Sequence, residues 1–341
     1  MVEAMIDPTL VEVTRGRYVE SRHTGAIVVV DTEGTRRVAV GDVERRVFPR
    51  SAVKSIQALP LVESGAADRY GFGNAELALA CSSHNAEPRH VATALRMLAA
   101  AGRGEGDLAC GGHEPMDKAS ADALVRAGKK PGRIHDNCSG KHSGMICFAC
   151  GTGLDPQGYE RPDHAAQRQI SAALTEVTGA DLGEPAVDGC SVPAYAIPLD
   201  KLALAFARIT TGEGLSLSRA EAARRLIEAV TAEPFMVAGT GRFDTEALTL
   251  FGRRLFIKSG AEGVFCAAFP DLGLGVAIKC DDGAQRGPET VMAAVIEAFL
   301  PPTEAERTAF AHRLRPPIDN RAGAVVGEVR PVPELAAMLR G

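Results

Sequence analysis

The sequence predicts an α/β protein of the α+β kind, in which an antiparallel sheet is flanked by helices and accompanied by a largely helical part. Short β-branched runs occupy the first fifty residues, helical patterns dominate the middle of the chain, and strand-like runs return later. Strands at both ends with helices between them favour one sheet built from the two chain ends. We predict one catalytic unit over residues 1–341, with a sheet part at about 1–50 and 195–341 and a helical part at about 51–194.

The strands of the sheet part are bounded by turn residues. Residues 25–30 form an apolar run, residues 31–34 read as a polar turn, and residues 37–40 form the second arm of a hairpin. Three further strands are expected at residues 255–258, 263–269 and 274–279.

Helix starts are marked by capping residues and helix faces by apolar spacing. Asn85 is expected to cap a helix with an apolar face of Val91, Leu95 and Leu98. Asp163 is expected to cap a helix that buries Ile170, Leu174 and Val177 and ends at Gly179. Two capping boxes, Ser218 with Glu221 and Thr303 with Glu306, open further helices, and another helix is expected at residues 289–300.

Composition and charge exclude several classes of protein and of binding partner. Apolar residues make up 45% of the 341 residues and the formal net charge is −5. A mildly acidic chain argues against nucleic acid or an anionic membrane as partner. The first eight residues carry acids where a secretory signal requires Lys or Arg, and no stretch approaches the roughly 20 apolar residues of a membrane span. With eight cysteines, too few for a disulfide scaffold, we predict a soluble, cytoplasmic protein with reduced thiols.

The first chemical motif is Ser51-x-x-Lys54, at the start of an apolar helical stretch. Residues three apart share a helix face, so a neutral Lys54 amine can take the proton of the Ser51 hydroxyl. Amide groups at a helix start can also stabilise an oxyanion formed there. Alone, the motif is equally compatible with a Ser and a Lys on an amphipathic surface helix.

Two more motifs follow in a fixed order. Ser83-x-Asn85 precedes a predicted helix, and Lys258-Ser259-Gly260 ends a predicted strand. Each has a plain structural interpretation, as a helix cap and as a strand-end charge. In the order S-x-x-K, S-x-N and K-[ST]-G, however, they match serine β-lactamases and penicillin-binding proteins. One Ser-Lys pair would make the nucleophile and a second would pass a proton to the leaving nitrogen.

Two cysteines in polar loops suggest a metal. Cys138 and Cys190 are about fifty residues apart, and the residues alone point to His142 as the third ligand. The alternative is two half-buried thiols without a metal. Cys147 and Cys150 form a C-x-x-C inside an apolar run, and we interpret them as core residues.

Four segments and the N-terminal strand resemble a known family, the Rhizobium etli-type L-asparaginases, which form the asparaginase II family. The resemblance covers nearly the whole chain. Its most specific parts are Pro49-Arg50-Ser51-Ala52-Val53-Lys54, Cys81-Ser82-Ser83-His84-Asn85, Asp136-Asn137-Cys138-Ser139-Gly140-Lys141-His142 and Asp188-Gly189-Cys190-Ser191.

This resemblance implies a serine β-lactamase/glutaminase-like fold, a homodimer and L-asparagine as a small-molecule substrate. It implies two catalytic pairs, a zinc site with an unusual lysine ligand, and a set of substrate-binding residues. In this sequence these match Ser51 with Lys54 and Ser83 with Lys258 for catalysis, Cys138, Lys141 and Cys190 for zinc, and Arg50, His142 and Asp188 for the substrate.

We therefore predict an L-asparaginase that releases ammonia through a Ser51 acyl-enzyme, with zinc present but not supplying the nucleophile. Three alternatives remain open. A β-lactamase or peptidase-like acyl hydrolase is disfavoured because no residue matches the deacylating Glu of β-lactamases. A zinc-dependent amidohydrolase would use metal-activated water. A binding protein on the same fold would release no ammonia.

Overall fold

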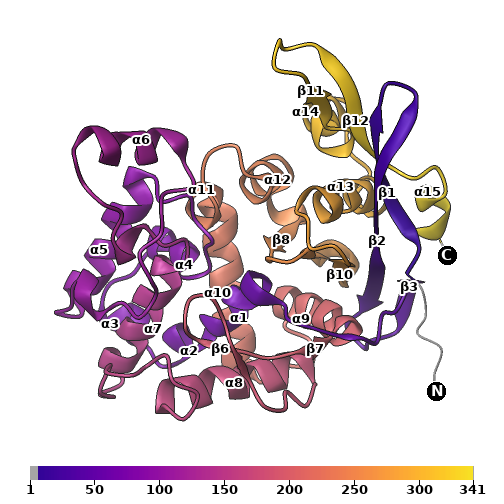
Figure 1. Ribbon diagram of the computed structural model, residues 1–341. Helices are drawn as coiled ribbons and strands as arrows, with labels where there is room; N and C mark the ends of the chain where they lie inside the picture. Colours follow the sequence, from indigo (N-terminus) through magenta and orange to yellow (C-terminus); the bar gives the residue numbers. More distant parts are fainter. Residues whose placement is uncertain (1–6, 341) are drawn as a thin grey trace. The chain divides into compact units, whose positions relative to one another are not determined.

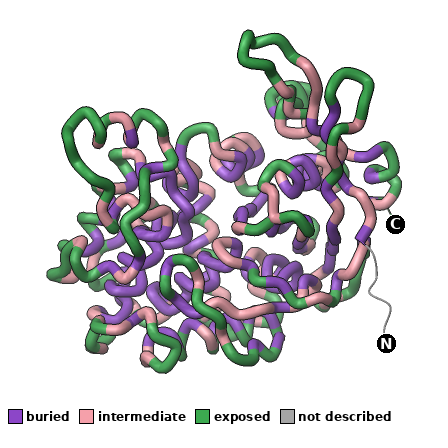
Figure 2. Tube along the Cα trace, viewed as in Figure 1, coloured by how far each residue is buried: buried purple, intermediate pink, exposed green. Residues whose placement is uncertain are grey.

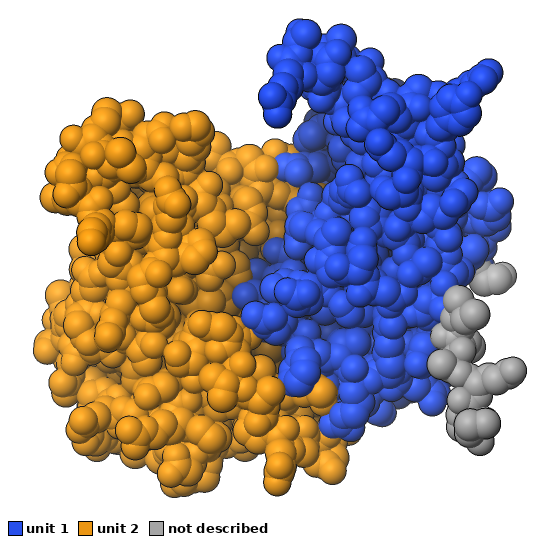
Figure 3. Space-filling model, in the orientation of Figure 1, with its two compact units in different colours: residues 1–52, 197–208, 250–341 blue, residues 53–196, 209–249 orange. Residues whose placement is uncertain are grey.

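The computed structural model describes residues 7–340, which form two compact units (Figure 3). One, the sheet unit, comprises residues 1–52, 197–208 and 250–341; the other, the helical unit, comprises residues 53–196 and 209–249. Residues 209–249 therefore belong with the helices, whereas the sequence grouped them with the sheet. No helix among the described residues is both long and apolar enough to cross a membrane.

The sheet unit is built around one antiparallel sheet with the order β11-β12-β1-β2-β10-β9-β8, and β3 also pairs with β2 (Figure 1). Strand β1 lies between β2 and β12, so the two chain ends meet in the sheet, as predicted. The strands are β1 Thr9–Arg15, β2 Tyr18–Asp31, β3 Arg36–Val40, β8 Phe256–Ser259, β9 Val264–Phe269, β10 Leu274–Cys280, β11 Pro317–Asp319 and β12 Val325–Pro331.

The predicted hairpin is confirmed. Strands β2 and β3 pair with Val28 opposite Ala39, and the Asp31 carboxylate accepts the backbone N–H groups of Glu33 and Thr35 in the turn. The predicted strands at 255–258, 263–269 and 274–279 are β8, β9 and β10 to within one residue at each end. The sequence did not mark β11, which has three residues, or β12, which has seven, and both are only partly buried.

Helices α9 Leu199–Thr211 and α13 Arg286–Phe299 cover opposite faces of β10. A Cβ on Gly275 would lie 2.0 Å from the Ala203 carbonyl of α9, while one on Gly287 of α13 would meet Cys280 at 3.1 Å. Side chains alternate between the two faces along a strand. Gly275 and Cys280 are an odd number of residues apart on β10, so they lie on opposite faces of the sheet. The central strands are consequently buried on both sides (Figure 2). This unit also contains α14 Glu304–Leu314 and α15 Leu335–Met338.

The helical unit packs around α7 Ser139–Gly151, in which every residue except Cys150 is buried. Its other helices are α1 Lys54–Gln57, α2 Leu59–Glu63, α3 Ala66–Arg69, α4 Asn74–Ala80, α5 Pro88–Ala100, α6 Lys118–Arg126, α8 Ala165–Thr178, α10 Leu217–Ala232 and α11 Pro234–Val237, and α12 Phe243–Phe251 runs from this unit into the sheet unit. Helix α7 contacts α3, α4 and α5. Its residues are mostly apolar or small, and Lys141 and His142 are the two large polar side chains buried among them.

Glycines of α7 allow the close packing of its neighbours. A Cβ on Gly140 would lie 2.4 Å from the Leu79 carbonyl of α4, and one on Gly151 would lie 2.6 Å from the Cβ of Ala66 in α3. Gly144 faces Ala80 at 3.1 Å. The C-terminal end of α4 is thereby held against the N-terminal half of α7, and the two chain segments richest in polar motif residues meet.

Several predicted helix details need correction. Helix α5 is capped by Glu87 rather than Asn85, and it buries His90, Ala94 and Met97 while Leu95 is exposed. The expected face is confirmed at Leu98, which is buried, but not at Leu95, because polar His90 finds partners inside the unit and occupies the buried face. The caps of α8 and α10 are His164 and Ser216 rather than Asp163 and Ser218.

Other predicted helix features are confirmed. Ile170, Leu174 and Val177 are buried in α8, and Gly179 ends that helix with φ of 64°. The capping box of Thr303 with Glu306 is formed at the start of α14. The helix predicted at residues 289–300 is α13.

Candidate active site

The candidate site of the helical unit lies where the segment after α4 runs beside the start of α7. Ser83 and Asn85 donate their backbone N–H groups to the carbonyls of Val237 and Ala238, so this segment pairs with the chain after α11 like a short strand. The N–H of His84 bonds to the Asn137 carbonyl on the other side. The hydroxyl of Ser83 is therefore presented from a backbone held on both sides.

Lys54 begins α1 and is 1% exposed. Its Nζ donates to the Ser82 carbonyl at 2.6 Å and to Ser83 Oγ at 2.9 Å, and it also hydrogen-bonds to Cys138. These three contacts account for all three protons of an ammonium group. The lysine of the S-x-x-K motif thus contacts the serine of the S-x-N motif.

Cys138, Lys141 and Cys190 form a second buried cluster beside Lys54. Lys141 Nζ lies 2.9 Å from Cys190 Sγ, and the two thiols are hydrogen-bonded to each other. Cys138 caps the start of α7 and Lys141 follows one helical turn later. All eight cysteines are free, so the structure brings these two thiols into contact without a disulfide.

The charges of this cluster depend on one another. The hydrogen bond from Cys190, assisted by the charges of Lys54 and Lys141, holds the pKa of the Cys138 thiol well below its ordinary value. The same hydrogen bond, together with burial, raises the pKa of Cys190. Burial opposes the charged form of Lys141, yet the two neighbouring sulfurs raise its pKa. The cluster therefore favours a thiolate at Cys138 beside the ammonium group of Lys141.

The chemistry of these donors fits zinc. Two thiol sulfurs and an amine converge in a buried position, and zinc prefers thiolate ligands with one nitrogen or oxygen donor. Within residues 7–340 no cluster of three His, Cys, Asp or Glu side chains has the geometry for a metal. Any metal here must use the lysine, which would first have to lose its proton. His142, the ligand chosen from the residues alone, directs Nδ1 to Tyr159 instead.

His142 is fully buried on α7, one residue after Lys141. Its Nδ1 lies 2.6 Å from the Tyr159 hydroxyl, while its Nε2 has no hydrogen-bond partner among the described residues. Burial, with the charges of Lys141 and Lys54, lowers the pKa of His142 well below its ordinary value, so the ring is neutral. An unpartnered buried donor or acceptor costs free energy unless a ligand satisfies it.

Asp188 and Cys190 lie in a tight turn between β5 Ala186–Val187 and β6 Pro193–Ala194. The Asp188 backbone bonds to Val192, and its carboxylate accepts the Cys190 N–H at 3.2 Å. Ser191 adopts a left-handed φ of 76° to close the turn. In this turn the half-buried carboxylate of Asp188 and the buried thiol of Cys190 are two residues apart.

Left-handed backbone lies beside several of the motifs. Among the described non-glycine residues, positive φ occurs only at Arg50, Ala86, Ser191 and Glu262. These positions adjoin Ser51, the Ser83–Asn85 segment, Cys190 and the turn after the Lys258 strand. Such strain costs free energy and concentrates at functional sites.

The side chain of Asn85 is hydrogen-bonded to a loop that the sequence did not predict. Its amide donates to the Thr240 carbonyl at 3.1 Å and accepts from the Arg242 guanidinium at 3.0 Å. Glu87 accepts the backbone N–H of Thr240 at 2.7 Å and its hydroxyl at 2.8 Å. The motif asparagine therefore fixes the loop at residues 239–242. Glycines on both sides of Thr240 were the one signal that marked this loop in the sequence.

In the sheet unit, the Ser51 and Lys258 motifs lie together. Ser51 lies in a 3₁₀ turn, Arg50–Val53, that leads directly into α1. A Cβ on Gly260 would lie 2.5 Å from the Pro49 carbonyl, so only glycine allows the end of β8 to approach the segment before Ser51. Lys258 is 2% exposed on β8. Arg50 lines a cavity of about 330 Å³ with Arg45, Arg46 and Lys279, and Glu262 and Asp281 also line it, so its charge is mixed.

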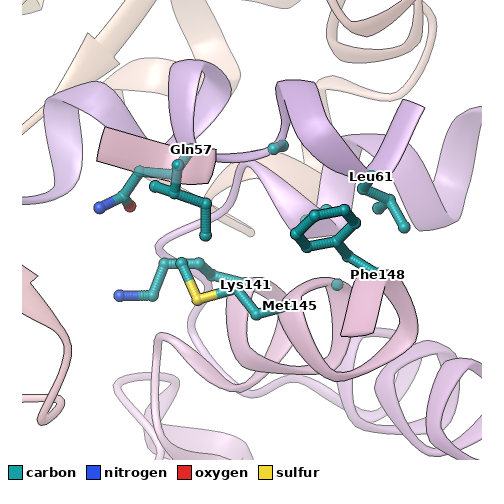
Figure 4. Close-up of a pocket in the computed structure, with 9 residues that line it drawn as sticks. Gln57, Leu61, Lys141, Met145 and Phe148 are labelled. Atoms are coloured by element: carbon teal, nitrogen blue, oxygen red, sulfur yellow. The ribbon is translucent and has the colours of Figure 1, made fainter. Parts of the chain in front are cut away.

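One further cavity lies under the Lys141 stem (Figure 4). Its volume is about 10 Å³, and Leu61, Met145 and Phe148 contribute apolar side chains to it. Such a space holds at most about one water molecule, so it cannot admit a substrate. In the figure the Lys141 amine and the Gln57 amide both point away from the apolar side chains. The cavity walls thus support the lysine stem while the amine reaches Cys190.

The family model for L-asparaginase II matches residues 11–331. The chain belongs to the L-asparaginase II family. Membership makes it an amidohydrolase that acts on a small molecule, which bears out the predicted class of enzyme and of substrate. A search of curated proteins found no significant match.

Two solved structures resemble this L-asparaginase II family member only distantly. A β-lactamase from Mycobacterium bovis is 14% identical, with 77% of this chain and 89% of that chain covered and a TM-score of 0.37. A β-lactamase from Sphaerobacter thermophilus is 16% identical, with 76% and 84% covered and a TM-score of 0.34. The family match, rather than these likenesses, supports the class of reaction.

Proposed function

We propose that the protein is an L-asparaginase that hydrolyses L-asparagine to L-aspartate and ammonia through a serine acyl-enzyme. The family match supports amide hydrolysis. The observation that carries the mechanism is the buried Lys54 amine in contact with a serine hydroxyl. As a neutral amine, Lys54 has one lone pair, which accepts the hydrogen bond of Ser83 at rest and can take a proton during the reaction. A lysine with this set of partners is suited to proton transfer.

In the proposed reaction, Ser51 Oγ attacks the side-chain amide carbon while Lys54 takes its proton. The carbon–nitrogen bond then breaks, and Ser83, paired with Lys258, supplies the proton with which ammonia leaves. Water then attacks the aspartyl ester; its proton and the proton held by Lys54 return to Ser51 and Ser83, so that aspartate leaves and both serines are restored. We propose that Arg50 and Asp188 bind the α-carboxylate and the α-ammonium group of the substrate, since each offers the opposite charge.

The test is to measure ammonia release from asparagine and glutamine and to locate the acylated serine. Ser51→Ala and Lys54→Ala should each lower kcat by at least about a thousandfold. When catalytic residues act as a unit, loss of any one of them removes nearly all of the activity. Ser55 is a matched control, since its buried hydroxyl has no hydrogen-bond partner among residues 7–340 and it directly follows Lys54. Ser55→Ala should keep kcat within about twofold.

A diazoketone analogue of asparagine followed by peptide mass mapping identifies the nucleophile. We expect the adduct on Ser51. An adduct on Ser83 would overturn that assignment and would make the Lys54–Ser83 contact the nucleophilic pair. Release of no ammonia from either amide by the folded protein would overturn the proposed function itself.

We also propose that Cys138, Lys141 and Cys190 hold a zinc ion. The donor set supports this, and bound zinc would add a positive charge that can orient a polar substrate. Metal analysis of protein purified without chelator should find up to one zinc per chain. Removing it should raise KM more than it lowers kcat, because the Ser-Lys pairs supply nucleophile, base and acid.

Variants separate this zinc role from a zinc-hydrolase mechanism. Cys138→Ala with Cys190→Ala should lose the metal yet hydrolyse asparagine at high concentration. Cys150→Ala, on the same helix but outside the cluster, should keep it. Complete inactivity of the folded double variant would favour metal-activated water, and absence of metal from the native protein would leave two structural thiols.

The remaining proposals concern the state of the protein in the cell. We propose a homodimer, which the family resemblance implies, and a cytoplasmic location, which the reduced thiols support. A solution mass of one chain would overturn the first of these.

A further inference from the structure

His84 lies between Ser83 and Asn85, is fully buried, and has no part in the proposed reaction. Its ring has a hydrogen-bond partner at each nitrogen. Nδ1 accepts the backbone N–H of Ala86 at 3.1 Å, and Nε2 lies 2.9 Å from the hydroxyl of Ser139. The side chain therefore connects the segment that presents Ser83 to the start of α7.

The partners determine the direction of both hydrogen bonds. A backbone N–H can only donate, so Nδ1 of His84 is the acceptor. The Ser139 hydroxyl has one proton, which it donates to the Ile134 carbonyl at 2.8 Å, so its oxygen accepts from Nε2. Burial lowers the pKa of His84 well below its ordinary value, in keeping with a neutral ring. His84 is thus an acceptor toward its own segment and a donor toward α7.

The bond to Nδ1 comes from a strained residue. Ala86 has a left-handed φ of 60°, which costs free energy for a residue with a side chain. The turn at Ala86 connects two anchored stretches. Before it, Ser83 and Asn85 donate to the chain after α11, and after it, Glu87 accepts the backbone N–H of Thr240. Relaxation of Ala86 would redirect the chain between these stretches and would move Ser83.

We infer that His84 is a positioning residue: its Nδ1 holds Ala86 in the left-handed turn, and the turn holds the Ser83 hydroxyl 2.9 Å from the amine of Lys54. The inference rests on the proposed asparaginase function, in which Ser83 supplies the proton with which ammonia leaves. The bond from Nε2 to Ser139 orients the ring on α7. Since the ring is fully buried, His84 acts through this segment alone.

His84→Gln tests the inference. The glutamine NH₂ can occupy the position of Nε2 and keep the bond to Ser139, but no acceptor remains for the N–H of Ala86. The value of kcat/KM for asparagine should fall about tenfold, the size of effect expected when one buried hydrogen bond is lost. The 4-nitrophenyl ester at the side-chain carboxyl of aspartate should lose less than about threefold, because its leaving group departs without a proton. General damage to the structure would lower both substrates alike.

Two further variants sharpen the test. His84→Asn can place its amide oxygen near the position of Nδ1, so kcat/KM for asparagine should stay within about threefold of the native value. It also serves as the second variant if His84→Gln does not fold. Glycine adopts left-handed φ without the cost to alanine, so in an Ala86→Gly background His84→Gln should lower kcat/KM for asparagine by less than about threefold.

His90→Gln is the matched control. His90 Nδ1 also accepts a backbone N–H, that of Glu87, and its Nε2 bonds to the Phe235 carbonyl. Glu87, however, has an ordinary φ of −66°, so no strained turn depends on this ring. Any loss in His90→Gln should therefore be equal for asparagine and for the ester.

Equal losses for asparagine and the ester in His84→Gln would overturn the inference. So would an equal loss in the native and Ala86→Gly backgrounds, or a tenfold loss in His84→Asn. Failure of the proposed function gives a different result, since the native protein would then release no ammonia from asparagine. In the outcomes above the native protein remains an asparaginase, and only the role of His84 is lost.

Discussion

Asn85 shows how a motif residue can serve the site without touching the substrate. Both ends of its amide are used, by the Thr240 carbonyl and by Arg242. Its backbone continues directly from Ser83, which contacts Lys54. We therefore assign Asn85 to holding the loop at residues 239–242 and, through its own backbone, the position of Ser83.

Asn85→Ala should lower both stability and turnover. The substitution removes both hydrogen bonds of the amide, and because Thr240 and Arg242 are not fully buried we expect a cost of about 0.5–1.5 kcal/mol for each bond. Urea unfolding and kcat for asparagine measure the two effects. Thr249→Val, an exposed change in α12 of the same unit, is the control and should alter neither. Loss of stability with normal kcat would show that the loop does not position Ser83.

The candidate site was only partly predictable from individual residues. Chemically distinctive types at motif spacings predicted Lys54, Ser83, Cys138 and Cys190, and the structure brings these four into one buried cluster. Tyr159 and Arg242 were missed because they reach the site from loops that carry no motif. Long-range contacts of that kind depend on packing, which local spacing does not encode.

At the scale of elements, α7 determines the site because so many motif residues lie on its first turns. Its glycines bring α4 close enough to place Ser82 and Ser83 beside Cys138. The buried face of α5 shows the limit of apolar spacing. His90 occupies the inner face because its ring bonds to the Phe235 carbonyl at 2.9 Å and stacks on His84.

Gly140→Ala should destabilise the protein although alanine favours helices by about 1 kcal/mol over glycine. The added Cβ would meet the Leu79 carbonyl at 2.4 Å, a backbone atom that cannot move aside alone. Overpacking of this kind costs about 1–3 kcal/mol. Urea unfolding should show the loss, and asparagine turnover should fall with it because α4 carries the segment that presents Ser83.

The control for this substitution is Gly111→Ala. A Cβ there meets nothing within 4 Å, and its φ is compatible with alanine, so stability should change by less than about 0.5 kcal/mol. Equal effects of the two substitutions would show that the α4–α7 distance adapts and does not determine the site.

For the whole molecule, the class of fold and most strands of the sheet were predictable, because β-branched runs and turn residues alternate clearly in β2, β3, β8, β9 and β10. The edge strand β11 and its neighbour β12 were not, since most of their residues are exposed or half-buried. Residues 209–249 read as helices in the sequence, but only tertiary contacts assign them to the helical unit.

The pairing of β1 with β12 has a consequence for synthesis of the protein. Residues 9–15 leave the ribosome first, yet one of their two partner strands is completed only at residue 331. The helical unit is complete by residue 249. The cluster of Lys54, Ser83 and Cys138 can therefore form in the nascent chain while one edge of β1 is still unpaired. Chaperones should accordingly be needed during translation mainly to protect the N-terminal strand. The sheet unit, which contains Ser51, is the last part of the enzyme to form.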